Sequence, residues 1–212
     1  MNIIRRPFKY RNYNIVYWLI GINVLIFAAT QLPVFGVRNS LAMRMSMIPL
    51  LVREGWVWTF ITYMFMHGSI SHILFNMLGL LIFGTHVERQ MGSFEFVLYY
   101  LLTGILAGIF SFGVYIVTRN YFVALMGASG ALFAVQLAYA VFFPDSIIYI
   151  WGILPLRAPV MVLGFTALEL IFSITRTSSG VAHLTHLAGF GFGWIYFLLR
   201  FGVNPWRRLT GR

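Results

Sequence analysis

Long apolar runs, separated by charged residues, glycine and proline, make up most of the chain. Six runs are read as membrane spans, at about 15–29, 72–85, 94–117, 127 to just before Pro144, 160–174 and 182–199. A transmembrane helix needs ~20 mostly apolar residues, and 212 residues accommodate six with short loops. The bilayer requires backbone groups to be satisfied within each segment. The pattern therefore predicts an all-α, polytopic membrane protein with six transmembrane helices, forming a single domain over residues 1–212.

The connection at about 31–71 does not fit a membrane span. Prolines and charged residues interrupt it, among them Pro33, Arg38 and Arg53, yet it also carries Met45 and Trp56. Aromatic side chains favour the level of the lipid headgroups. We therefore expect this long first loop to be associated with the membrane surface. A second apolar stretch, at 147–154, is too short to cross and is followed by prolines.

The composition narrows the class of protein. Hydrophobic residues make up 60% of the chain and charged residues 9%, with a mean hydropathy of +0.84. Soluble domains are roughly 45–50% apolar and about 25% charged. These values exclude an ordinary soluble domain, a disordered chain and a disulfide scaffold. Cysteine is absent, which excludes thiol chemistry and cysteine-ligated metals.

The basic residues set the predicted orientation. The chain has 15 Lys and Arg against 5 Asp and Glu. With six spans and the N-terminus inside, ten basic residues fall on the cytoplasmic side and five outside, which follows the positive-inside rule. We therefore expect both termini in the cytoplasm, and we assign the basic ends to topology rather than to nucleic-acid binding. The inner set is Arg5, Arg6, Lys9, Arg11, Arg89, Arg157, Arg200, Arg207, Arg208 and Arg212, and the outer set is Arg38, Arg44, Arg53, Arg119 and Arg176.

In this topology the second, fourth and sixth spans all run from outside to inside, and each begins with polar residues. The second carries His72 and Asn76, the fourth Ser129, and the sixth His183 and His186. Polar side chains in a bilayer are costly and usually face the bundle interior. The pattern therefore brings serine, histidine and asparagine to one depth near the outer leaflet.

Serine and histidine together indicate nucleophilic catalysis. A serine hydroxyl is a weak nucleophile until a base such as imidazole removes its proton. Asparagine, histidine and the free amides at a helix start can stabilise the oxyanion that forms. The two spans also have to approach closely, and their small residues permit this, although such patterns are common in ordinary membrane packing. The small residues are Gly130, Ala134 and Ala138 on the fourth span, and Gly189 and Gly193 on the sixth.

At these residues the sequence resembles the rhomboid family of intramembrane serine proteases. Four stretches carry the resemblance, in the family's order and on the expected spans. They are the GxSG motif at 127–130, the His and Asn motif at 67–76, the HxxG motif at 186–189 followed by Gly193, and the turn with Val87-Glu88-Arg89 and Gly92.

The resemblance implies a Ser–His dyad with Ser129 as nucleophile and His186 as general base and acid. It implies that His72, Asn76 and the Ser129 amide stabilise the oxyanion. It implies a supporting role for Gly127 and Gly130 of the GxSG motif, for Gly189 of the HxxG motif, and for Phe133, four residues after Ser129.

No carboxylate is needed to complete a triad in that family, and the sequence agrees for two of the acids. Asp145 falls at the opposite membrane side and Glu88 at an inner turn. Glu169, inside the fifth span, could lie nearer. We interpret it mainly as a paired or hydrated membrane glutamate.

Two positions depart from the pattern of many relatives. The first loop reads Trp58-Thr59 where those relatives have Trp-Arg, which places the stability of the loop in question more than catalysis. Phe133 stands where they have tyrosine, so its ring can pack on His186 but offers no hydroxyl.

Neither a metal nor another cofactor is expected. His183-x-x-His186 is the only close histidine pair, and no Glu or Cys at ligand spacing accompanies it. His67 is expected to support the loop and the start of the second span, with a direct catalytic role as the alternative.

The expected function is that of an intramembrane serine endopeptidase that cleaves in or near the transmembrane segments of membrane proteins. Its partners are then those substrates and the bilayer, and the sequence leaves the oligomeric state open. A non-enzymatic helix-binding member of the same fold and a small transporter are the alternatives, although no inverted repeat is visible. The compact form without added domains or targeting sequence favours a bacterial plasma membrane, with the site opening toward the outer side.

Overall fold

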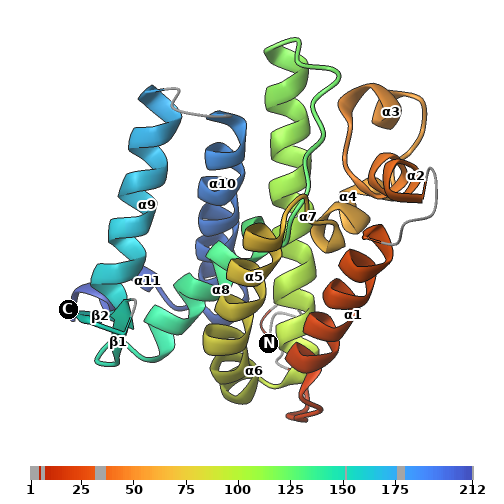
Figure 1. The fold of residues 1–212 in the computed structure, drawn as a ribbon. Helices are drawn as coiled ribbons and strands as arrows, with labels where there is room; N and C mark the ends of the chain where they lie inside the picture. Colours follow the sequence, from red (N-terminus) through yellow and green to blue (C-terminus); the bar gives the residue numbers. More distant parts are fainter. Residues whose placement is uncertain (1–4, 6–7, 32–36, 151, 176–179, 212) are drawn as a thin grey trace.

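The computed structural model describes residues 5, 8–31, 37–150, 152–175 and 180–211, and it is mostly helical (Figure 1). The basic residues Arg6, Arg176 and Arg212, used in the charge comparison, lie outside this part. The long helical elements are α1 (Ile15–Thr30), α5 (Ile70–Gly79), α6 (Thr85–Met91), α7 (Ser93–Val117), α8 (Ser129–Phe142), α9 (Ala158–Thr175) and α10 (Gly180–Tyr196). The fourth span therefore begins at Ser129, two residues later than predicted, because Gly127 and Ala128 belong to the preceding turn.

The second span is longer than its sequence pattern indicated. A π-helical segment, η3 (Leu80–Gly84), joins α5 to α6 so that 22 residues, Ile70–Met91, run as one helix. The extension contains buried Glu88. Its carboxylate accepts hydrogen bonds from the backbone amides of Ile15 and Val16, at 2.7 and 3.0 Å. These are free amides at the start of α1, which attract negative charge. The charge that ends the span in the sequence pattern thus fixes a neighbouring helix.

Successive long helices run in alternating directions. In Figure 1, α1, α7 and α9 run upward, whereas α5–α6, α8 and α10 run downward. Among the described residues, Ile70–Met91, Ser93–Val117 and Ala158–Thr175 are long and apolar enough to cross a membrane, and α1 and α8 are shorter apolar helices. The protein is therefore mostly helical with membrane-capable helices. The count of six crossings and the cytoplasmic position of both termini stay predictions.

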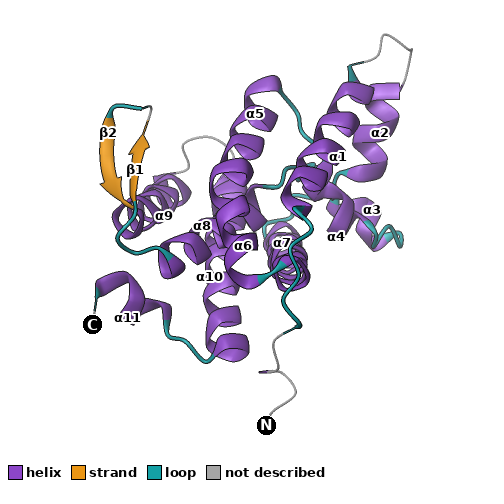
Figure 2. Cartoon of the chain, turned by 90° about the horizontal axis from the view of Figure 1, so that it is seen from below, coloured by secondary structure: helices purple, strands orange, loops and turns teal. Residues whose placement is uncertain are grey.

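Short helices fold the first loop into a compact unit on one side of α7 (Figures 1 and 2). They are α2 (Val37–Met45), α3 (Pro49–Arg53), α4 (Thr59–Thr62) and the 3-10 turn η2 (Tyr63–Phe65). Thr59, at the position of the usual arginine, is buried and its hydroxyl donates to the Trp56 carbonyl at 2.6 Å. The indole of Trp58 donates to the Arg44 carbonyl at 3.0 Å. Local hydrogen bonds thus stabilise the loop where an arginine is missing.

A small hairpin corrects the all-α prediction. Strands β1 (Ile147–Ile150) and β2 (Leu154–Arg157) pair antiparallel, with Ile147 opposite Arg157 and Ile150 opposite Leu154. Figure 2 shows the hairpin beside α9. The stretch is too short for a span, but its isoleucines favour extended backbone. Pairing the two segments satisfies backbone groups that neither could satisfy alone.

The centre of the bundle is the contact of α8 and α10 with α7. Tyr99 on α7 is buried and donates its hydroxyl to the Ala134 carbonyl on α8 at 2.6 Å. Below it, Arg200 makes two hydrogen bonds to buried Glu95, at 2.7 and 2.8 Å. Arg200 lies in the π-helical segment η4 (Phe197–Phe201), which is followed by α11 (Pro205–Thr210). This charged pair fixes the lower end of α10 to the start of α7, while the upper part of α10 carries the polar residues.

Candidate active site

Ser129 is held at the first turn of α8 by an unusual backbone turn. Gly127 has φ +118°, and its amide donates to the Tyr63 carbonyl at 2.8 Å. A side chain there would be strained, and its Cβ would lie 2.6 Å from Nε2 of His72. The turn therefore requires glycine, and it exposes Ser129 where helix amides are free.

The extended chain before this turn is fixed to the first loop. Met47 and Leu125 exchange backbone hydrogen bonds of 3.0 and 2.9 Å. Tyr63 reaches α7, where its hydroxyl donates to the Gly104 carbonyl at 2.6 Å. The first loop thus holds the segment that presents Ser129.

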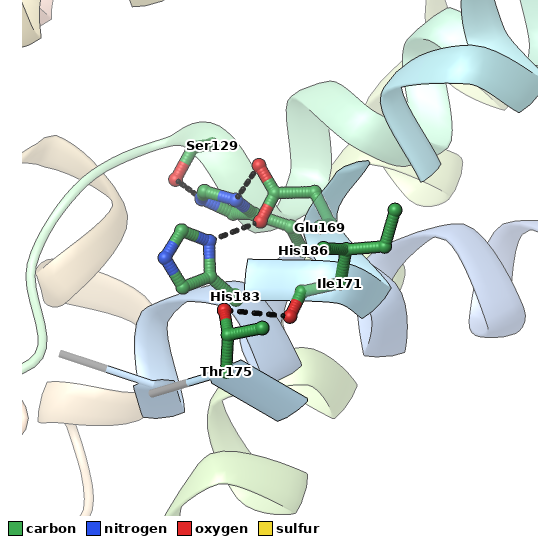
Figure 3. Close-up of polar contacts among 6 residues, drawn as sticks. All are labelled: Ser129, Glu169, Ile171, Thr175, His183 and His186. Carbon is green, nitrogen blue, oxygen red and sulfur yellow. Dashed lines mark hydrogen bonds and ion pairs between the residues drawn. The ribbon is translucent and has the colours of Figure 1, made fainter. Parts of the chain in front are cut away.

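Ser129 and His186 meet across the contact of α8 and α10. Oγ of Ser129 lies 2.7 Å from Nε2 of His186, within hydrogen-bond distance (Figure 3). The two helices approach so closely at this level that Gly189 faces the Gly130 carbonyl, with space for no Cβ. Phe133 lies flat on the His186 ring, with 4.6 Å between centroids and 6° between planes. The ring stack fixes the plane of the imidazole.

Glu169 on α9 also reaches this histidine, which its sequence position did not predict. Its Oε1 lies 3.1 Å from Nδ1 of His186, and its Oε2 lies 2.5 Å from Nδ1 of His183 (Figure 3). The interpretation of Glu169 as a paired membrane glutamate identified neither partner. The available signal was an acid inside an apolar span, which usually marks function or pairing.

His72 and Asn76 lie on α5, on the other side of Ser129 from α9. The His72 ring packs against Gly127, and its centroid is 4.9 Å from that of His67. The Asn76 side-chain amide donates to the His72 carbonyl at 2.8 Å, which leaves one N–H of that amide, and Asn76 lines the same groove as Ser129. Asn76 therefore lies in the groove beside Ser129, and His72 packs against the turn that precedes Ser129.

His67 lies in the loop just before α5 and is 2% exposed. Burial, together with the nearby charge of His72, lowers the pKa of His67 from 6.5 to about 4. A neutral imidazole is therefore its stable form, which fits support of the loop better than proton transfer.

Ser129 opens onto an apolar groove of about 720 Å³. Residues of α5, α8, α9 and the hairpin form its walls. Its polar lining is limited to a few side chains, including Asn76, Ser129, Gln136 and Glu169. The side chains around Ser129 are therefore mostly apolar.

Among the described residues, Glu169, His183 and His186 also bring three potential metal ligands together, with ligand atoms within 4.8 Å of one another. The expectation of no metal depended on spacing along one helix, and the carboxylate comes from another. Two histidines and a glutamate can hold zinc. In this arrangement, however, the carboxylate itself faces both Nδ1 atoms, so each ring has a partner within the protein.

Comparisons with known proteins show which family the chain resembles. The model of the rhomboid domain matches residues 54–203. Rhomboid protease GlpG of Haemophilus influenzae is 30% identical over 180 residues, 84% of this chain and 86% of that protein. RHOMBOID-like protein 12, mitochondrial, of Arabidopsis thaliana is 32% identical over 156 residues, 65% of this chain and 44% of that protein. Rhomboid protein 1, mitochondrial, of Saccharomyces cerevisiae is 32% identical over 143 residues, 66% of this chain and 39% of that protein.

The chain thus spans less than half the length of these two mitochondrial relatives, but most of the bacterial one. The match to the domain model includes α5 to α10 and every residue of the candidate site. The protein belongs to the rhomboid family and is an integral membrane protein.

Proposed function

We propose that this protein is an intramembrane serine endopeptidase that uses Ser129 and His186 to hydrolyse peptide bonds in or near transmembrane segments. The observation that carries the proposal is the 2.7 Å contact between Ser129 Oγ and His186 Nε2 at the edge of an apolar groove. A nucleophile in hydrogen-bond reach of its base is the geometry that covalent catalysis requires. GlpG, which this chain resembles over most of both lengths, is named a rhomboid protease.

The geometry supports the following order of steps. Nε2 of His186 accepts the hydroxyl proton as Oγ of Ser129 attacks the peptide carbonyl. The oxyanion then forms near the Ser129 amide and the side chains of His72 and Asn76, which stabilise it. His186 returns the proton to the leaving amine, and water later releases the acyl group by the reverse sequence.

The groove indicates what kind of substrate reaches Ser129. Its walls are apolar and include exposed hydrophobic residues such as Leu168 and Phe172. A helical peptide bond is shielded by its own hydrogen bonds, so the segment has to unwind before attack. We therefore propose single-pass membrane proteins as substrates, cut near the outer leaflet. Relatives from bacteria and from mitochondria both match, so the bacterial plasma membrane stays an expectation.

Covalent labelling tests the proposal. A fluorophosphonate probe should label the purified protein in detergent, and the protein should cleave a transmembrane reporter peptide. Ser129→Ala and His186→Ala should each abolish labelling and cleavage while the melting temperature is retained. The matched controls are Ser71→Ala and His86→Ala, two exposed residues outside the groove lining, which should behave as wild type.

The alternative is a non-enzymatic family member that binds transmembrane helices. A folded wild-type protein that shows neither labelling nor cleavage would support it. Cleavage that survives in a purified Ser129→Ala or His186→Ala variant would remove that residue from the mechanism.

A further inference from the structure

Glu169 occupies a position that the Ser–His mechanism does not explain. It contacts Nδ1 of His186, whose other ring nitrogen, Nε2, faces Ser129, so that hydroxyl, imidazole and carboxylate follow one another (Figure 3). We propose that Glu169 is a positioning residue for His186 and that His183 holds its carboxylate in place, so that the site works as a Ser–His–Glu row. This inference rests on the proposed function.

The first argument is the identity of the two ring nitrogens. Nε2 of His186 can accept the Ser129 proton only if the neutral ring carries its hydrogen on Nδ1. Nδ1 lies 3.1 Å from a carboxylate oxygen, which accepts hydrogen bonds and donates none when ionised. Glu169 therefore selects the tautomer that the reaction needs, and it stabilises the imidazolium formed when Ser129 loses its proton.

The second argument is the medium. The side chains of Glu169 and His186 are 16% and 19% exposed, and the groove around them is largely apolar. Charges attract each other more strongly where water is scarce. The Glu169 carboxylate therefore stabilises a transient His186 imidazolium more strongly here than it would at a solvent-exposed surface.

The third argument is mechanical. The flat stack of Phe133 sets the plane of the His186 ring but leaves the ring free to turn within that plane. The contacts of Ser129 on Nε2 and of Glu169 on Nδ1 together restrict this remaining movement. The Nδ1 contact of 3.1 Å is short enough for a hydrogen bond but is bent and not aligned as one. Catalytic hydrogen bonds often tighten only when substrate binds, and a small in-plane turn would align this one.

His183 completes the arrangement on the far side of the carboxylate. Its Nδ1 lies 2.5 Å from Oε2 of Glu169, and it shares α10 with His186 one turn away. The carboxylate is thus held by one helix at both oxygens although it comes from another. His183 would act through Glu169, without touching the reacting atoms.

Kinetics of Glu169→Gln test the inference. Loss of the triad carboxylate lowers kcat ~10⁴-fold in soluble serine proteases. For Glu169→Gln we expect a ~10–100-fold lower kcat, because the contact between Glu169 and Nδ1 of His186 is bent and therefore weaker than the triad hydrogen bond. KM for the reporter peptide should stay within about twofold, and fluorophosphonate labelling of Ser129 should slow in parallel with kcat. His183→Gln should show a smaller loss of the same kind. The control is Thr166→Val, a polar residue one turn away on α9, which should match wild type.

A merely structural role for Glu169 predicts a different pattern, with a lower melting temperature and an unchanged kcat. If Glu169→Gln does not fold, Glu169→Asp keeps the charge but withdraws the carboxylate by about one carbon–carbon bond length, and it should also lower kcat. Activity of Glu169→Gln or Glu169→Asp equal to wild type overturns the inference but leaves the proposed function intact. A wild-type protein that is neither labelled nor active removes the proposed function itself. Activity that EDTA abolishes and zinc restores overturns the inference as well, because the three side chains would then hold a metal.

Discussion

Replacing Gly189 by alanine tests whether the close contact of α8 and α10 sets the catalytic geometry. A Cβ on Gly189 would overlap the Gly130 carbonyl oxygen and lie 2.7 Å from its carbonyl carbon. Ordinary contact begins at 3.4 Å. Both atoms are backbone and cannot rotate away. The two helices therefore have to separate by more than the roughly 0.7 Å that the carbon alone requires, because the oxygen is nearer still.

Such a shift acts directly on the site, because Gly130 follows Ser129 and Gly189 lies one turn beyond His186. It would stretch the 2.7 Å Ser129–His186 contact to 3.4 Å or more, beyond a good hydrogen bond. A misplacement of about 1 Å can lower a rate by 10²-fold. Overpacking of this kind also destabilises a fold by about 1–3 kcal/mol.

The control is Gly191→Ala on the same helix, where a Cβ would meet nothing within 4 Å. Alanine is favoured over glycine in a helix by up to about 1 kcal/mol, so this variant should be as stable as wild type or slightly more so. The measurements are the melting temperature in detergent and the rate of fluorophosphonate labelling. We expect Gly189→Ala to lose about 10–100-fold in labelling rate together with a lower melting temperature. Equal labelling by the two variants would refute the reasoning.

Three further predictions concern the oxyanion, pH and topology. Asn76→Ala and His72→Ala should each lower kcat, by at most the ~10²–10³-fold seen for one oxyanion donor, with little change in KM or melting temperature. Normal kcat in both variants and in the double variant would leave only backbone donors. Because the pKa of His67 falls from 6.5 to about 4 on folding, its contribution to stability is complete above pH 6.5 and is lost as pH falls toward 4, by up to about 3 kcal/mol. His67→Gln should therefore show a flatter melting-temperature profile between pH 6.5 and 4, and a slope equal to wild type would contradict the assignment. A cysteine at Arg119 should react with an impermeant thiol reagent added outside and one at Arg208 should not, since the chain has no native cysteine; the opposite pattern would invert the topology.

Much of the fold follows from the sequence because the bilayer restricts the choices. Apolar runs of span length have to become helices, and the expected runs at 94–117 and 160–174 coincide with α7 and α9 to within two residues. The ends of the helices differ from the prediction where a charged residue inside a span is paired with a group on another helix. The sequence pattern ends a span before Glu88, whereas in the structure Glu88 lies inside the helix and accepts hydrogen bonds from the start of α1. The hairpin after α8 was missed because pairing between two short segments leaves no periodic signal in either one.

The sequence alone determined which residues could carry out the chemistry, because Ser129 and His186 stand in short motifs of fixed spacing on separate apolar runs. Only the tertiary structure decided which carboxylate faces His186. Spacing along a helix predicts neighbours three and four residues apart, whereas Glu169 and His186 belong to different helices, and their contact depends on how α9 packs against α10. The spacing of residues in the sequence shows which side chains share a face of one helix. The rotation and depth at which two helices meet are set by the shape of all the side chains between them.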